Sequence, residues 1–130
     1  VGSNPAAQVR KLAELPGLVV TGRVADVRPY LAHATAAIAP MRIARGIQNK
    51  VLEAMAMARP VIVSEAGIEG IKATHGQDVL VASQASDYAR YIDDVLGNNH
   101  LTLGSCARRR VIEDFSWENN LPLVGQLLEQ

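Results

Sequence analysis

The hydrophobic and polar positions of this chain change their period several times, and each change marks the edge of a predicted element. Short apolar runs predict strands, whereas apolar residues three or four positions apart predict helices with one buried side. The two patterns alternate through residue 97, with a strand-like run before each helix-like segment. This alternation predicts an α/β fold: a Rossmann-like, doubly wound parallel sheet with helices on both faces and a helical C-terminus.

Four apolar runs predict the strands of the sheet, at residues 18–21, 36–39, 61–64 and 78–82. Helices are predicted at residues 5–15, 27–34, 47–58, 83–96, 101–115 and from 117 to the end. Asn4, Asp26 and Ser116 are the residue types that cap helix N-termini, and each precedes one of these helices. Residues 65–77 form the longest predicted loop. Ligands of such folds bind at the carboxyl ends of the strands, where loops 2–5, 22–26, 40–46 and 64–76 are expected.

The most regular helical pattern follows the strand that Pro40 closes. Gly46 supplies the backbone freedom that a strand-to-helix turn often needs. Arg59 ends the helix, because the residue before a proline is pushed out of the α region. One side of the helix is predicted to face the core, with Ile47, Val51, Ala54, Met55 and Ala58.

Charged residues gather near the start of this helix. Arg42 and Arg45 precede it, Lys50 lies in its first turn, and Glu53 follows one turn later. Cations beside the free N–H groups of a helix N-terminus favour an anion, above all a phosphate. Glu53 is then placed to bind a neutral polar part of the same ligand, such as a sugar hydroxyl. The alternative is a surface pair of Lys50 with Glu53, worth about 0.2–0.5 kcal/mol.

The motif G-x-x-x-K-V-L-E-A-M-A-x-x-x-P-V-I-V, from Gly46 to Val63, resembles the signature of the family-four nucleotide-sugar glycosyltransferases. Those enzymes have two Rossmann-like domains that face each other across a cleft, the GT-B architecture. The resemblance covers nearly the whole chain, as the C-terminal, donor-binding domain (1–130). It implies that the acceptor domain and the first strand–helix unit of the donor domain lie upstream. The chain by itself is therefore expected to be inactive.

The family pattern has one glutamate, seven further residues, and then a second glutamate in L-E-A-M-A. Glu53 matches the second glutamate, which binds the ribose of the donor, whereas Arg45 stands at the position of the first. Some members carry P-x-R…G-x-x-x-K instead, and Pro40, Arg42 and Lys50 match that subgroup. Bacterial exopolysaccharide sugar transferases are common in it.

The resemblance implies retaining transfer of a sugar from a UDP- or GDP-type donor to a hydroxyl acceptor, a saccharide or lipid-linked saccharide. No metal or other cofactor is implied. The expected catalytic residues are Glu53, Lys50 and Arg45. The expected nucleotide-binding residues are Arg42, Arg45, Gly46, Ile47, Gln48, Asn49, Lys50 and Glu53, with Gly22, Arg23 and Val24 around the base.

The amino-acid composition argues against several other functional classes. The 13 basic and 13 acidic residues cancel, and only 4% of residues are aromatic, which disfavours a nucleic-acid-binding surface. Cys106 is the single cysteine, so the chain has no internal disulfide and no cysteine cluster for zinc. No run reaches the roughly 18 apolar residues of a membrane span. We expect a cytoplasmic protein, with a peripheral position at the inner membrane left open for the full-length enzyme.

Two alternative functions remain from the sequence: a GT-B sugar-nucleotide epimerase and a non-catalytic interaction domain. Several single residues are interpreted as structural. His33, His75 and His100 share no metal-binding spacing and are expected at the surface or in caps. Arg108–Arg110 are expected on a solvated helix face. Trp117 is expected to anchor the last helix, although the resemblance also allows that helix to cross to the other GT-B domain.

Overall fold

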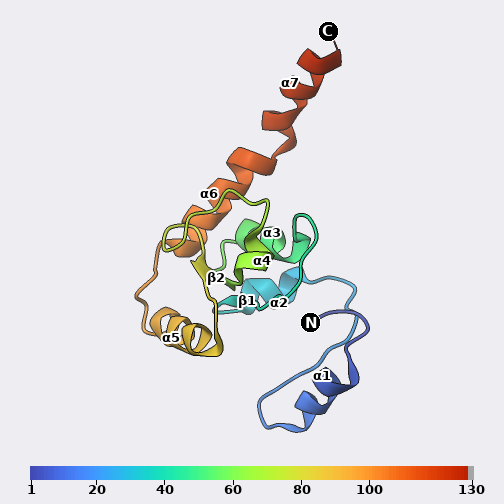
Figure 1. The fold of residues 1–130 in the computed structure, drawn as a ribbon, viewed down its shortest axis with the longest axis vertical. Coiled ribbons are helices and arrows are strands. Elements are labelled where there is room, and N and C mark those ends of the chain that lie inside the picture. Colours follow the sequence, from blue (N-terminus) through green and yellow to red (C-terminus); the bar gives the residue numbers. More distant parts are fainter. Residues whose placement is uncertain (129–130) are drawn as a thin grey trace. The chain divides into compact units, whose positions relative to one another are not determined.

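The computed structural model describes residues 1–128. The chain divides into two compact units, residues 1–30 and residues 31 onward, and the boundary falls inside α2 (Arg28–His33). We describe each unit by itself. Unit 2 holds the sheet and most of the helices (Figure 1).

The sheet of unit 2 has three parallel strands, β1 (Ala37–Ala39), β2 (Val61–Val63) and β3 (Leu80–Val81), in the order β1-β2-β3. Ala37 lies opposite Val61, and Ile62 lies opposite Leu80. Three of the predicted strands are therefore confirmed, each slightly shorter than its apolar run. Helices surround this sheet and continue to the C-terminal end of the described chain, as the predicted α/β fold requires.

The central strand β2 is buried on both faces, which explains a run without any polar residue. Val61 and Val63 pack into one core, together with α3 (Asn49–Ala56) and α6 (Leu103–Phe115). Ile62 packs into a second core, on the side of α5 (Ala85–Leu96). Because side chains of a strand alternate between faces, these two cores place helices on both sides of the sheet.

The predicted buried side of α3 is confirmed for Val51, Ala54 and Met55, which are almost completely buried. The prediction is wrong for Ile47, which precedes the helix and is 44% exposed. The helix starts only at Asn49, because Gln48 has extended dihedral angles (φ −89°, ψ 103°). Ala58 lies beyond the helix, in a left-handed conformation (φ +54°).

The C-terminal end of α3 is tied to its surroundings by two arginines. Arg59 donates from Nη1 to the Ala34 carbonyl (3.1 Å) and from Nε to the Met57 carbonyl (3.2 Å), and Arg108 donates to the Ala56 carbonyl. Gly104 lets α6 approach closely, because a Cβ there would lie 2.1 Å from the Ala58 carbonyl oxygen. Cations suit this end of a helix, where the carbonyl groups are unpaired.

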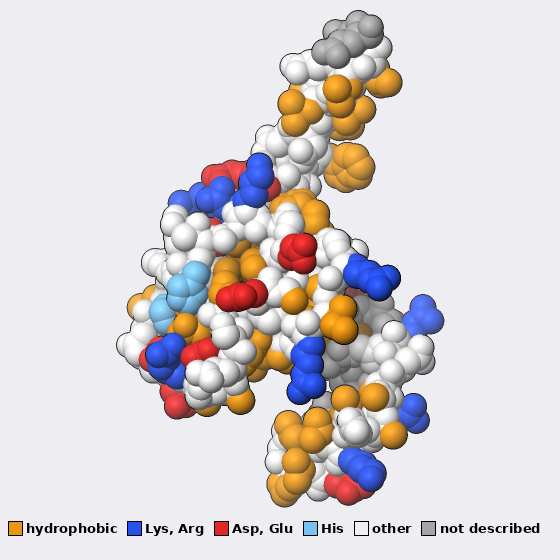
Figure 2. Space-filling model, in the orientation of Figure 1, with side chains coloured by type: hydrophobic (Ala, Val, Ile, Leu, Met, Phe, Trp, Pro, Cys, Tyr) orange, Lys and Arg blue, Asp and Glu red, His pale blue; other side chains and the backbone are white. Residues whose placement is uncertain are grey.

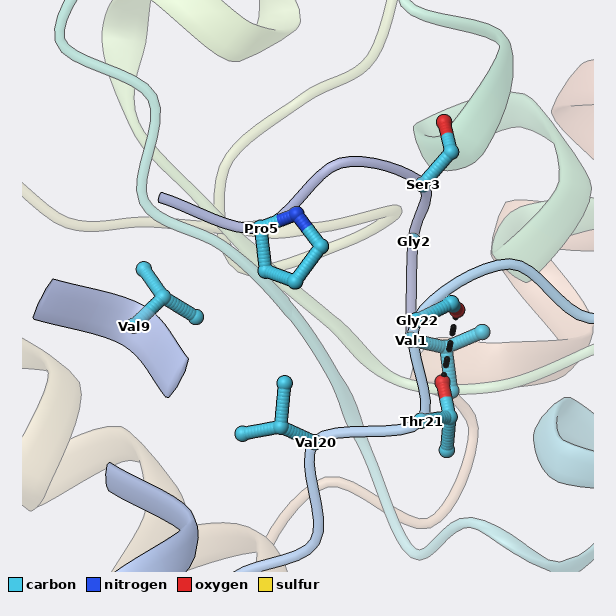
Figure 3. Close-up of a pocket in the computed structure, with 8 residues that line it drawn as sticks. All are labelled: Val1, Gly2, Ser3, Pro5, Val9, Val20, Thr21 and Gly22. Carbon is cyan, nitrogen blue, oxygen red and sulfur yellow. Dashed lines mark hydrogen bonds between the residues drawn. The ribbon is translucent and has the colours of Figure 1, made fainter. Parts of the chain in front are cut away.

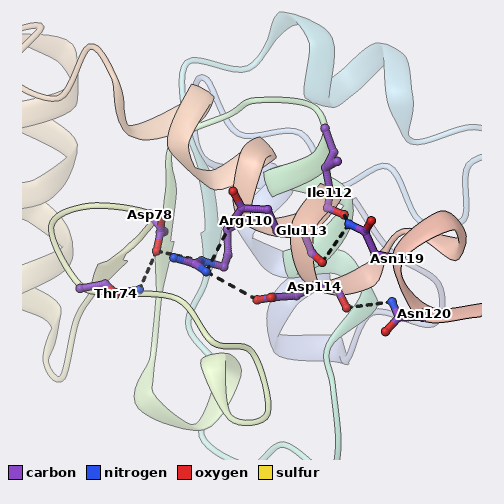
Figure 4. Close-up of polar contacts among 8 residues, drawn as sticks. All are labelled: Thr74, Asp78, Arg110, Ile112, Glu113, Asp114, Asn119 and Asn120. Atoms are coloured by element: carbon purple, nitrogen blue, oxygen red, sulfur yellow. Dashed lines mark hydrogen bonds and ion pairs between the residues drawn. The ribbon is translucent and has the colours of Figure 1, made fainter. Parts of the chain in front are cut away.

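Arg110 is the centre of a second polar network (Figure 4). Its Nε lies 3.6 Å from the buried carboxylate of Asp78, and its Nη1 lies 3.5 Å from Glu113 Oε2 and 4.0 Å from Asp114 Oδ2. Asp78 also accepts a hydrogen bond from the Thr74 amide (2.9 Å). A buried carboxylate needs such partners. The prediction of a solvated arginine face is therefore wrong for Arg110. It is confirmed for Arg108 and Arg109, which are exposed, although Arg108 also donates to the Ala56 carbonyl at the end of α3.

The predicted loop 65–77 contains a short helix, α4 (Glu65–Ile68), so that prediction is wrong at its start. Ser64 explains the helix, because its Oγ accepts a hydrogen bond from the Gly67 amide (3.1 Å) as an N-cap. Further along, His75 Nδ1 accepts from the Val81 amide (2.9 Å). His75 thus satisfies a backbone donor of β3, in agreement with its predicted surface or capping role.

The last helix, α7 (Trp117–Leu128), starts after Ser116, whose Oγ accepts from the Asn119 amide (3.3 Å) as predicted. Trp117 does not anchor it within the described residues, because its side chain is 76% exposed. Figure 2 shows apolar side chains gathered on the surface of α7. The most exposed are Trp117, Leu127 and Leu128. In the part of the chain that the structure describes, no helix has the length and apolar content to cross a membrane.

Unit 1 contains α1 (Ala7–Lys11) and a 3-10 turn, η1 (Leu12–Glu14). The predicted strand at 18–21 is wrong: these residues form no strand, and Val19 is 80% exposed. A strand needs a ladder of backbone hydrogen bonds to a neighbour. Here a single backbone hydrogen bond, from the Gly2 amide to the Gly22 carbonyl (3.1 Å), joins the N-terminal segment to the end of this run.

The two N-terminal caps have different outcomes. Asn4 does not cap α1, because Ala6 holds the N-cap position and Asn4 has a left-handed φ of +51°. Asp26 does accept a hydrogen bond from the Arg28 amide (2.9 Å), where α2 begins. Asp26 lies one residue upstream of the N-cap position and bonds to the first residue of α2, so the predicted N-cap is wrong by one residue although the side chain does satisfy an amide at the helix start.

Met55→Ala should lower the free energy of unfolding by about 2–5 kcal/mol, through lost burial and a new cavity. Met55 is fully buried between α3 and the sheet. Urea unfolding measures the change. Met57→Ala is the matched control, because Met57 ends the same helix and is only partly buried. Equal losses in the two variants would contradict this packing of α3.

Candidate functional site

The carboxyl ends of the three strands meet at one edge of the sheet of unit 2. Pro40, Ser64 and Ala82 each directly follow a strand. Ser64 joins two of these ends, because its Oγ donates to the Met41 carbonyl (2.7 Å) while it caps α4. The loop after β1 is therefore held against the end of β2.

A cavity of about 440 Å³ lies at this edge. Its size is within the range of small-ligand sites, roughly 300–1,000 Å³. Its polar lining combines one guanidinium, three hydroxyls and one carboxamide, and contains no carboxylate. The lining residues are Pro40, Met41, Arg42, Ser64, Ala82, Ser83, Gln84, Ala85 and Tyr88.

Tyr88 projects into this region from α5 and carries a buried hydroxyl. Among the described residues its Oη has no hydrogen-bond partner. Burial raises the pKa of the Tyr88 phenol, and the neighbouring Ser64 hydroxyl opposes that shift. The hydroxyl therefore stays protonated to a higher pH than an exposed tyrosine, and its unmet hydrogen-bonding capacity costs stability.

The loop between the cavity and α3 is shaped by Gly46 and Gln48. Gly46 has a φ of +67°, which confirms the predicted need for glycine, and open space surrounds the position where its Cβ would be. The Gln48 side chain donates to the carbonyls of Gly46 (3.1 Å) and Arg45 (3.4 Å). Gln48 thus stabilises the turn, although no side chain of the described residues caps the N-terminus of α3.

The four charged residues singled out from the sequence all lie on exposed positions of this loop and helix: Arg42, Arg45, Lys50 and Glu53. Within residues 1–128, none of their side chains forms an ion pair or hydrogen bond. In particular, Lys50 and Glu53 do not pair, so the surface-pair alternative is not realised. Their charges remain available to a ligand.

Ile47 and Asn49 complete the predicted segment. Ile47 lies against the loop after α4, because a Cβ at Gly70 would be 3.2 Å from Ile47 Cγ1. Asn49 is the first residue of α3. The structure thus brings the predicted residues 42–53 together along one continuous loop and helix start, beside the segment that follows β2.

Sequence reasoning missed four polar residues of the cavity: Ser64, Ser83, Gln84 and Tyr88. Ser64 and Ser83 follow predicted strands, which was the available signal. Gln84 and Tyr88 belong to the start of α5, and nothing in their spacing distinguished them from ordinary helix residues.

In unit 1, Gly22 has a φ of +67° and lines a smaller cavity of about 200 Å³ (Figure 3). Arg23 and Val24 are not among its lining residues, and Arg23 is exposed. Thr21 Oγ1 donates to the Gly22 carbonyl (2.9 Å) within this turn. The role of Gly22, Arg23 and Val24 at a nucleotide base stays a prediction.

Tyr88→Phe should raise the free energy of unfolding by about 1 kcal/mol, because it removes an unpaired buried hydroxyl. The gain should grow above about pH 10, because the unfolded tyrosine ionises there more readily than the folded one, whose pKa is raised. Urea unfolding of both proteins at pH 7 and pH 10.5 (roughly half a unit above that ionisation) measures the difference.

Tyr91→Phe is the control on the same helix, since the Tyr91 hydroxyl accepts from Arg90 Nη2 (3.3 Å). We expect no gain there. A destabilised Tyr88→Phe protein would show that the Tyr88 hydroxyl is well paired in solution.

Comparison with known proteins assigns a family. The sequence profile described as "Glycosyl transferases group 1" matches residues 1–98. No curated protein and no solved structure matches the chain. Because the profile covers most of the sequence, the chain belongs to the glycosyl transferases group 1 family, and glycosyl transfer is its general activity.

Proposed function

We propose that this member of the group 1 glycosyltransferases binds a nucleotide-sugar donor through the segment from Arg42 to Glu53. One observation carries the proposal: three cations and one carboxylate, all unpaired within the described residues, lie on the single stretch that leads from the carboxyl edge of a parallel sheet through an uncapped helix start. Exposed charges usually offset one another at a protein surface. Their concentration here suits a ligand with both anionic and neutral polar parts.

The diphosphate of the donor is the anionic part. Arg45 and Lys50 supply positive charge to the turn that leads into α3, where the amides of Gly46, Ile47, Gln48 and Asn49 lie. Arg42 adds positive charge from the neighbouring cavity at the strand ends. Helix N-termini and cations together bind phosphates. In the transfer step, Arg45 and Lys50 stabilise the charge that develops on the departing nucleotide, which is the electrostatic contribution that lowers such barriers.

Glu53 binds the neutral polar part, the ribose. It lies one turn beyond Lys50 on the exposed side of α3, while Val51, Ala54 and Met55 hold the opposite side in the core. A carboxylate that accepts two hydroxyl protons forms charge-assisted hydrogen bonds. Its position is therefore set by core packing that does not depend on the ligand.

The complete reaction that we propose is retaining transfer of a sugar from a UDP- or GDP-type donor to a hydroxyl of a saccharide or lipid-linked saccharide. The match of Pro40, Arg42, Gly46 and Lys50 to the exopolysaccharide subgroup supports a role in cell-surface glycan synthesis, on the cytoplasmic side of the membrane. A non-catalytic interaction domain would not need the unpaired charges, and a sugar-nucleotide epimerase would need further acid–base groups.

Glu53→Gln should weaken UDP or GDP binding about ten-fold or more, since a charge-assisted hydrogen bond is worth about 1.5–3 kcal/mol. Lys50→Ala should also weaken binding, and the loss should be larger at low salt because its partner is a phosphate. Isothermal titration calorimetry at two salt concentrations measures both effects.

Lys72→Ala and Glu118→Gln are matched controls, because both residues are exposed and lie outside the segment. All four variants should unfold at the wild-type urea concentration, since none removes a contact of the folded chain. Equal nucleotide affinities in wild type, Glu53→Gln and Lys50→Ala would overturn the proposed site.

A further inference from the structure

The cavity at the strand ends separates Arg42 from the other charged residues of the proposed donor site. Arg42 lines the cavity, whereas Arg45, Lys50 and Glu53 do not. The loop from Arg42 to Lys50 therefore has two regions. One is the start of α3, where the proposed function places the diphosphate, and the other is the cavity beside it.

The cavity lining has the chemistry of a sugar site. The Ser83 hydroxyl can donate to and accept from sugar hydroxyl groups, and the Gln84 carboxamide, whose oxygen caps α5, keeps its NH2 donors. Ser64 can only accept, because its own proton goes to the Met41 carbonyl. Met41 and the Tyr88 ring form apolar walls. Arg42 is the single permanently charged lining residue, and its guanidinium has no partner within residues 1–128. A planar guanidinium matches a carboxylate with two parallel hydrogen bonds.

The backbone that carries Arg42 is held in place before any ligand binds. The Met41 carbonyl accepts the hydrogen bond from Ser64 Oγ (2.7 Å), and Ser64 is fixed in turn by the Gly67 amide (3.1 Å). Pro40 directly precedes Met41, and its ring restricts the backbone dihedral angles at the start of this loop. Such preorganisation reduces the entropy that a ligand must overcome on binding.

We infer that this cavity holds the sugar of the donor and that Arg42 selects a sugar with a carboxylate, a hexuronate. The inference rests on the proposed function, because the nucleotide must occupy the adjacent start of α3. The lining holds no acidic side chain. The carboxylate of Asp87, which accepts from the Ser83 and Gln84 amides beside the cavity, is paired with Arg90 (3.6 Å). The sugar hydroxyls face Ser64, Ser83 and Gln84.

Isothermal titration calorimetry with two series of ligands tests the inference. The first series is UDP, UDP-glucose and UDP-glucuronate, and the second is GDP, GDP-mannose and GDP-mannuronate. We expect the hexuronate donor to bind about ten-fold tighter than the matching hexose donor, as a bidentate charge-assisted contact allows. Equal affinities of the two donors in wild type would overturn the inference.

Two arginine variants separate the inference from the proposed function. In Arg42→Gln the preference for the hexuronate should fall to nearly one-fold. Arg45→Gln, the same substitution on the same loop but outside the cavity, should weaken both donors and preserve their ratio. A hexuronate preference that survives in Arg42→Gln refutes the role of Arg42. Failure of UDP and GDP to bind wild type would instead refute the proposed function.

A pair of alanine variants tests the cavity itself. Ala85→Leu places a larger side chain in the lining, whereas Ala89→Leu makes the same change at an exposed position of α5 outside it. We expect Ala85→Leu to weaken both sugar nucleotides at least five-fold relative to the free nucleotide, roughly 1 kcal/mol, and Ala89→Leu to change neither. Full sugar-nucleotide affinity in Ala85→Leu would show that the sugar lies elsewhere.

Discussion

Burial of β2 on both faces is the constraint on which the rest of unit 2 depends. Val61 and Val63 need α3 and α6 on one side, and Ile62 needs α5 on the other. The strand also needs parallel neighbours on both edges, which β1 and β3 provide. Because all three strands run in the same direction, their carboxyl ends coincide. The meeting of the loops at Pro40, Ser64 and Ala82 is therefore a consequence of the core, and the cavity needs no separate explanation.

Some charged residues of the chain are paired within the fold, whereas those of the candidate site are not. None of the ion pairs of the described residues involves Arg42, Arg45, Lys50 or Glu53, and the most buried of these pairs joins Asp78 to Arg110. That pair connects the loop before β3 to α6. The charges around the start of α3 behave in the opposite way, since they gain nothing from the fold and remain exposed. A chain with equal numbers of acidic and basic residues thus has a local excess of positive charge where the proposed donor binds.

The sequence was sufficient where one element determines its own structure. The apolar run of β2, the buried side of α3 and the left-handed Gly46 all follow from local pattern, and the structure confirms them. The sequence was insufficient where the structure of a segment depends on contacts with residues far away in the chain. Residues 18–21 look like a strand, but within unit 1 they have no neighbouring strand to pair with. Arg110 looks like a solvated residue, but the buried Asp78 needs it.

The candidate site shows the same limit. The charged residues between 42 and 53 lie close together in the sequence, so they were identified from their position at a predicted helix start and from the resemblance to a family motif. Ser64, Ser83 and Tyr88 reach the cavity from separate elements, and their convergence depends on the register that pairs Val63 with Val81. A pattern along the chain carries no information about that register. The cavity could therefore be identified only from the three-dimensional structure.

The two ends of α3 explain how stability and ligand binding coexist in one helix. At the C-terminal end, carbonyl groups receive donors from Arg59 and Arg108, and α6 approaches closely at Gly104. At the N-terminal end, side chains of the described residues provide no cap. A helix with both ends capped would be more stable by about 1 kcal/mol, but its amides would be occupied. Anchoring one end and the buried side fixes the helix firmly enough that the other end can keep its donors and its positive dipole for a phosphate.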